Sequence, residues 1–68
     1  MNWITQIVKR EVFKYRLKNA FKRYAPDIDA ETLRMEIDTI MAFDYDEDDI
    51  SWTAAELAAS EAISYWHE

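Results

Sequence analysis

The sequence has no glycine, no cysteine, one proline and one histidine among its 68 residues. Without cysteine, disulfides, thiolate metal sites and thiol catalysis are excluded, and the chain fits a reducing compartment, so we expect a cytoplasmic location. Without glycine, neither a phosphate-binding loop nor a dinucleotide-binding fingerprint exists. A single histidine, His67, gives no histidine cluster for a metal and argues against a Ser-His-Asp triad. We therefore expect neither a cofactor nor a metal ion.

Long apolar runs are also missing, although 50% of the residues are hydrophobic. No run approaches the roughly 20 residues of a membrane-spanning helix, and charges begin at Lys9, so we expect neither a membrane partner nor a signal peptide. The hydrophobic content favours a folded domain over disorder. Residues 1–68 then form a single small domain, which needs tight helix packing or a partner chain for its stability.

Charge is strongly segregated along the chain, although the net charge is only −6. Residues 1–24 carry a net charge of +6, whereas residues 25–68 contain one base, Arg34, and carry −12. Segregation of this strength indicates either ion pairing between the two parts or two differently charged surfaces. If the parts pair, the fold should weaken as salt screens the ion pairs.

Helix signals predict an all-α fold, a small three-helix bundle with a long basic N-terminal helix and two acidic helices. The predicted helices cover about residues 3–24, 30–43 and 54–66. Asn2 is a suitable N-cap for the first helix, and Pro26 ends it by disfavouring helical backbone at the residue before it. Asp29 is a suitable N-cap for the second helix.

The start of the third helix carries two signals that agree. The run Thr53-Ala54-Ala55-Glu56 matches a capping box, in which Thr53 is the N-cap and Glu56 reaches back to it. Trp52 and Leu57 have the spacing of the hydrophobic staple that accompanies such a cap. We therefore expect the helix to begin just after Thr53.

The spacing of apolar residues predicts which faces are buried. In the second helix the buried stripe contains Ala30, Leu33, Ile37, Ile40 and Met41. In the third helix one face contains Ala54, Ala55, Ala58, Ala59, Ala62, Tyr65 and Trp66. Most of these residues are small, so another helix can approach closely.

The first helix is apolar on two opposite sides. One side contains Trp3, Phe13, Leu17, Phe21 and Tyr24, and the other contains Ile4, Val8, Val12 and Tyr15. Two interpretations stay open. Either the helix crosses the other two obliquely, so that its buried face drifts, or the second side is an interface with another copy in a homodimer.

An acidic loop follows the second helix. We expect a partner-binding surface formed by Asp44, Tyr45, Asp46, Glu47, Asp48 and Asp49, with Glu36 and Asp38 nearby. Tyr45 is the expected anchor of this surface, because a core position is unexpected for a residue amid acids. The loop does not match a calcium-binding EF-hand, since Asp49, Ser51 and Ala55 occupy its positions 6, 8 and 12.

Paired carboxylates of this kind are expected to be ionised and wet rather than catalytic, so we expect no enzyme. Fixed carboxylates can instead occupy a basic groove of a partner protein that otherwise holds nucleic acid. The predicted function is a small acidic inhibitor or regulator, analogous in size and charge alone to phage-type anti-CRISPR and anti-restriction proteins. The alternative is a dimeric nucleic-acid-binding regulator that uses the bases of the first helix. These bases are Lys9, Arg10, Lys14, Arg16, Lys18, Lys22 and Arg23.

Overall fold

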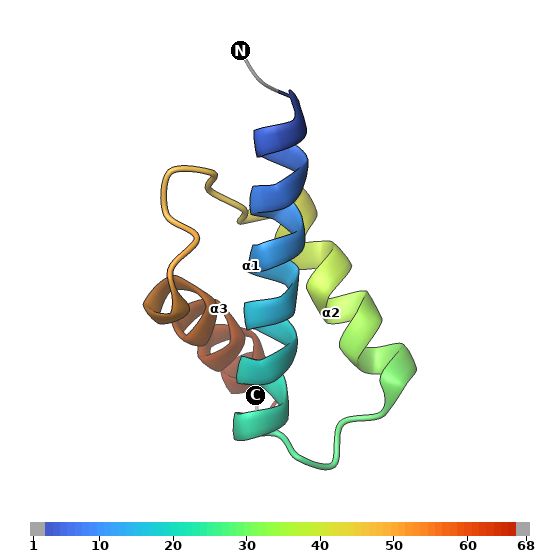
Figure 1. Ribbon diagram of the computed structural model, residues 1–68. Coiled ribbons are helices and arrows are strands. Elements are labelled where there is room, and N and C mark those ends of the chain that lie inside the picture. Colours follow the sequence, from blue (N-terminus) through green and yellow to red (C-terminus); the bar gives the residue numbers. More distant parts are fainter. Residues whose placement is uncertain (1–2, 67–68) are drawn as a thin grey trace.

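The computed structural model describes residues 3–66 and confirms the all-α three-helix bundle (Figure 1). Within these residues there are three helices and no strand. The helices are α1 (Trp3–Tyr24), α2 (Ala30–Phe43) and α3 (Trp52–Tyr65). Asn2 and His67 lie outside the described residues. No helix in the described part of the chain is long and apolar enough to cross a membrane.

The first two helices have the ends that the sequence predicts. Helix α1 stops at Tyr24, two residues before Pro26. Asp29 caps α2, because its carboxylate accepts the backbone N–H of Thr32 at 3.1 Å and the Thr32 hydroxyl at 2.6 Å. These bonds, the hydroxyl bond most of all, favour the ionised form and lower the pKa of Asp29 below its ordinary value.

Helix α3 begins at Trp52, earlier than predicted, because Ser51 is its N-cap. The Ser51 hydroxyl accepts the backbone N–H of Ala54 at 3.1 Å and donates to the Asp49 carboxylate at 2.8 Å. This hydroxyl is thus fixed from both sides. The prediction of Thr53 as the cap is wrong, since Thr53 already lies inside the first helical turn.

The earlier start changes the surroundings of Trp52, which the sequence paired with Leu57. The Trp52 ring meets the Tyr15 ring edge-on at 6.2 Å, and the Arg16 guanidinium lies 5.5 Å from the Trp52 ring centre. Arg16 also donates a hydrogen bond to the Ile50 carbonyl oxygen. These contacts attach the start of α3 to α1, and Leu57 remains 60% exposed. The predicted hydrophobic staple is therefore wrong.

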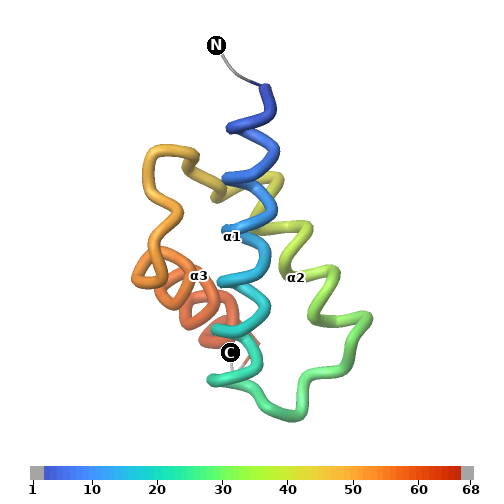
Figure 2. Tube along the Cα trace, in the orientation of Figure 1, coloured from blue at the N-terminus to red at the C-terminus, as the bar shows by residue number. Residues whose placement is uncertain are grey.

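Helix α1 is the central element, since it packs against both other helices while α2 and α3 barely contact each other (Figure 2). Ala55 and Ala59 of α3 are fully buried, and their small side chains let the α3 backbone approach α1 closely. The other buried residues are Phe13, Leu17, Ala20 and Phe21 of α1 and Leu33, Ile37, Ile40 and Met41 of α2. The predicted stripe of α2 is thus confirmed except at Ala30, which is exposed.

The first turns of α1 project beyond the rest of the molecule (Figure 1). Their apolar side chains are about half exposed or more: Trp3 67%, Ile4 53%, Ile7 49% and Val8 53%. Buried positions of α1 begin only at Phe13, and all of them lie on one side of the helix. The second apolar side of α1 is therefore exposed at Ile4 and Val8, half-buried at Val12 and in contact with Trp52 at Tyr15.

Candidate functional site

A groove of about 630 Å³ lies between α2 and α3 and is lined by carboxylates on an apolar floor. Four acids line it, and none of its lining residues is a lysine or an arginine. Its acids are Glu36, Asp44, Asp49 and Glu61, and its apolar residues are Ile40, Ala54, Leu57, Ala58, Ala62, Tyr65 and Trp66. We call this the acidic groove.

Helix geometry and local hydrogen bonds determine where the acids of this groove lie. Asp44 follows the last residue of α2, and its N–H donates to the Ile40 carbonyl oxygen at 2.8 Å. Asp49 is oriented by the Ser51 hydroxyl, which donates to its carboxylate. Glu61 projects from α3 one helical turn after Leu57. The groove thus combines acids from α2, the following loop and α3.

Trp66 lies at the far end of α3 and helps to position Glu36. Its ring stacks on Phe21 with 6.2 Å between the ring centres and 18° between the planes. Its indole N–H donates to a Glu36 carboxylate oxygen at 3.4 Å. The ring is 40% exposed, so it contributes an apolar surface to the groove as well.

The structure divides the acids that the sequence grouped together. Glu36, Asp44 and Asp49 do meet in the acidic groove, whereas Asp38 lines a different groove, between α1 and α2. Asp38 lies two residues after Glu36, which places it on nearly the opposite side of α2. Asp46, Glu47 and Asp48 are exposed on the loop, where the Asp46 carboxylate accepts the backbone N–H of Asp48 at 2.9 Å.

Sequence reasoning missed Glu61 as a member of the site. Its place in the helix carried a signal, because it follows Leu57 and Ala58 by four and three residues and so shares their face. The face itself was predicted from its alanines, but its acid was left unassigned. Glu61 completes the set of four carboxylates around the groove.

Tyr45 is not the exposed anchor that the sequence predicts. Its ring centre lies 5.6 Å from that of Phe13, and the Arg10 guanidinium lies 5.2 Å from the ring. The Tyr45 hydroxyl is buried and has no hydrogen-bond partner. This desolvation raises the pKa of the phenol, and the charge of Arg10 offsets part of the effect. The acids beside Tyr45 stay in solvent, while its ring covers the core at Phe13.

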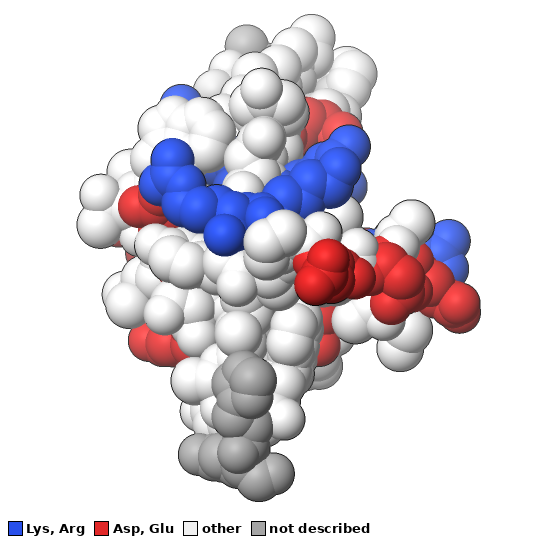
Figure 3. Space-filling view, turned by 90° about the horizontal axis from the view of Figure 1, so that it is seen from below, with Lys and Arg blue, Asp and Glu red and all other residues white. Residues whose placement is uncertain are grey.

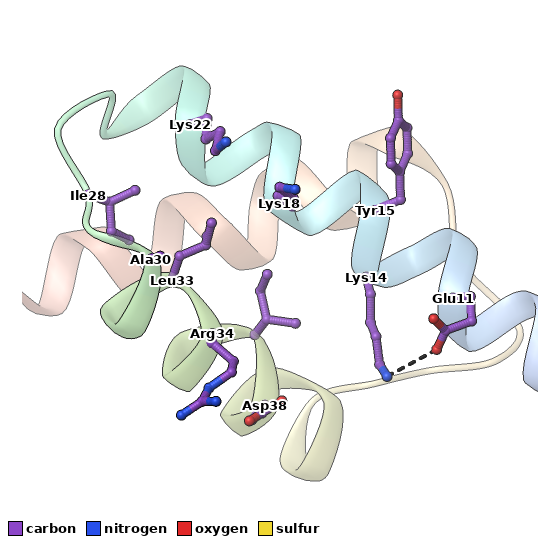
Figure 4. A pocket seen from close by; sticks show the side chains of 11 residues that line it. Glu11, Lys14, Tyr15, Lys18, Lys22, Ile28, Ala30, Leu33, Arg34 and Asp38 are labelled. Atoms are coloured by element: carbon purple, nitrogen blue, oxygen red, sulfur yellow. Dashed lines mark hydrogen bonds and ion pairs between the residues drawn. The ribbon is translucent and has the colours of Figure 1, made fainter.

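The second groove, of about 730 Å³, lies between α1 and α2 and has a cationic rim (Figure 4). The bases are Lys14, Lys18 and Lys22 of α1 and Arg34 of α2. Three of them recur every fourth residue along α1 and therefore share one side of that helix. Lys14 forms an ion pair with Glu11 at 3.0 Å. The floor is formed by Ile28, Leu33 and Ile37, and we call this the cationic groove.

The three arginines of α1 contact other parts of the fold. Arg10 and Arg16 lie over aromatic rings, and Arg23 pairs with Glu56. That last contact is the one ion pair between helices in residues 3–66, so broad pairing of a basic helix with acidic ones is wrong. Lys and Arg instead form a band across one face, with acidic side chains beside it (Figure 3). The charge segregation of the sequence thus appears in Figure 3 as a basic band with acidic side chains on either side of it.

The described residues contain no group of three or more histidine, cysteine, aspartate or glutamate side chains that could hold a metal ion. No protein-family model matches the chain, and no curated protein and no solved structure matches it. The two grooves and the exposed turns of α1 are the candidate binding surfaces of the described residues.

Proposed function

We propose that the protein is a non-enzymatic binding module whose acidic groove holds a basic, amphipathic helical segment of a partner protein. The observation that carries this proposal is a groove with four carboxylates, an apolar floor and no lysine or arginine. An apolar helix face would cover the exposed side chains of Leu57 and Tyr65, which are 60% and 70% exposed. Lysine or arginine at the edges of that face would meet the carboxylates.

The exposed loop acids support the same proposal. Asp46, Glu47 and Asp48 extend the negative charge beyond the groove, and such charge accelerates the association of a basic partner. Basic surfaces of this kind are typical of proteins that handle nucleic acid. The proposed role is therefore a small acidic inhibitor or regulator of such a protein, of the phage anti-CRISPR or anti-restriction type.

A pull-down from nuclease-treated extract of the native host tests the proposal with three baits. The first is the unchanged chain. The second, the groove variant, carries Leu57→Lys and Glu61→Lys. The third, the control variant, carries Glu31→Lys and Met35→Lys, which lie four residues apart on an exposed part of α2 that lines neither groove. Both variants change the net charge by the same amount.

A partner of the acidic groove is retained by the unchanged chain and by the control variant and is lost from the groove variant. Two such changes, at exposed residues that the partner would cover, should weaken binding by about 30-fold or more. Proteins that all three baits retain equally would show that the groove is not the binding surface. Circular dichroism of both variants checks that the helices remain.

The cationic groove gives a second candidate function, direct binding of nucleic acid. The observation in its favour is the row of Lys14, Lys18 and Lys22, which shares the groove with Arg34. If all four bases contact phosphates, affinity for a DNA probe should fall about 10-fold for each doubling of salt. A gel-shift titration starting at about 50 mM salt measures this, with Lys18→Glu as the disabling change. No shift at that salt concentration argues against nucleic-acid binding.

A further inference from the structure

The projecting turns of α1 present an apolar face that the core of the chain does not use. Trp3, Ile7 and Val8 are each about half exposed or more. At about 100° per residue, Val8 lies about 140° round the helix from Trp3, with Ile7 between them. These side chains therefore form a broad apolar surface that spans both apolar sides of α1. The bases Lys9 and Arg10 follow immediately, and residues 3–10 carry a net charge of +2. The segment is thus a basic helix with an apolar face.

We propose that this segment, residues 3–10, docks in the acidic groove of a second copy of the chain. The inference rests on the proposed function, because it assigns an occupant to the same groove. The exposed Trp3, Ile7 and Val8 match the apolar floor, and the positive segment matches a groove lined by four carboxylates and no base. The apolar helix face and the positive charge that define the expected partner are therefore both present in the chain itself.

The segment cannot fill the groove of its own chain. Helix α1 is continuous over 22 residues, and its buried contacts begin at Phe13. The preceding turns project away from the bundle, as Figure 1 shows. Bending them back would break the helix. An occupant formed by residues 3–10 must therefore come from another molecule.

Charge also decides between this contact and a symmetric contact of α1 with α1. Residues 1–24 carry +6, so packing two copies of α1 together would bring like charges into contact, which opposes association. Docking in the acidic groove joins opposite charges. Because the segment and the groove are different surfaces, each copy can donate a segment and accept one, which is a heterologous contact.

Two disabling variants test the contact. The segment variant carries Ile7→Asp and Val8→Asp, at positions that are 49% and 53% exposed. The groove variant is again Leu57→Lys with Glu61→Lys. The matched control for the segment variant places aspartate at Met35 and Phe43, which are exposed by 59% and 84% and line neither groove. If the segment variant loses helicity, Val8→Ser replaces it.

Sedimentation equilibrium gives the mass of each form against the 8.1 kDa monomer. The unchanged chain and the control should self-associate, and each disabling variant alone should weaken this by about 30-fold or more. An equimolar mixture of the two variants retains one good segment and one good groove. It should therefore form a species of twice the monomer mass.

Three results would overturn the inference. The first is that the unchanged chain stays monomeric at about 1 mM, a concentration at which even weak complexes form. The second is that the groove variant still self-associates. The third is that the equimolar mixture of the two variants stays monomeric. Self-association that survives in the groove variant would indicate a symmetric α1 contact. If the unchanged chain is monomeric but its groove still retains a host protein, the proposed function stands and only the second copy is excluded.

Discussion

Replacing Tyr45 with phenylalanine should make the protein more stable. The Tyr45 hydroxyl is buried without a hydrogen-bond partner, whereas it binds water in the unfolded chain. Phenylalanine keeps the ring that contacts Phe13 and faces Arg10. Tyr45→Phe thus removes the desolvation cost and leaves the packing in place.

The size of the effect follows from that cost. An unsatisfied buried polar group costs about 1–3 kcal/mol. Tyr45 as a whole is only half-buried, so we expect the lower limit, a gain of about 1 kcal/mol in the free energy of unfolding. For a domain of this size such a gain raises Tm by about 4–8 °C. The contrasting variant Tyr45→Ala should destabilise, because it removes the ring from Phe13.

Thermal unfolding monitored by circular dichroism gives the Tm of both variants, first near neutral pH. The alkaline range gives a second readout, because burial raises the pKa of Tyr45 in the folded state. Above about pH 10 the unfolded phenol ionises while the folded one stays protonated, so the stability of the unchanged protein falls as pH rises. Tyr45→Phe should lack this part of the decline.

A loss of stability in Tyr45→Phe of about 1 kcal/mol would refute the reasoning, because the hydroxyl would then have a partner. An identical alkaline decline in both proteins would also contradict it. Tyr45→Phe should leave self-association unchanged, since the residue belongs to the core and not to the acidic groove.

Three further predictions concern the helix ends and the ion pairs. Ser51→Ala should lower the free energy of unfolding by about 1 kcal/mol, because Ser51 is the N-cap of α3. Thr53→Ala should lower it by clearly less, and urea unfolding measures both variants. Asp29 has a lowered pKa, so its capping bonds stabilise the fold above about pH 4 and are lost as pH falls through the folded pKa. Asp29→Asn should therefore show a smaller fall of Tm between about pH 5 and 3. Arg23→Ala should cost less than about 1 kcal/mol, and added salt should change Tm little, because the ion pair of Arg23 is exposed.

Most of the fold could be predicted because local signals and apolar spacing agree. Pro26 and Asp29 mark the helix ends, and the stripe of α2 follows from its period. The start of α3 could not be predicted, since both Ser51 and Thr53 suit an N-cap. The choice depends on the hydrogen bond from Ser51 to Asp49, which forms only in the folded loop.

The candidate site was predicted in part. The acidity of residues 44–49 was evident, and Asp44 and Asp49 do line the groove. The direction of each side chain was not evident, because neighbours in a loop point different ways. Tyr45 therefore turned inward against expectation. Asp38 was assigned to the wrong surface because it was grouped with Glu36 by closeness in sequence, although the helical period places the two on nearly opposite sides of α2.

The central claim is that the acidic groove, and not the net charge, is the binding surface. The most direct measurement is the amount of each host protein that the two charge-matched baits retain after nuclease treatment. One bait carries Leu57→Lys with Glu61→Lys in the groove, and the other carries Glu31→Lys with Met35→Lys outside it. We predict that the bound protein is lost from the groove bait and kept by the other. Equal loss from both baits, or equal retention by both, would contradict the claim.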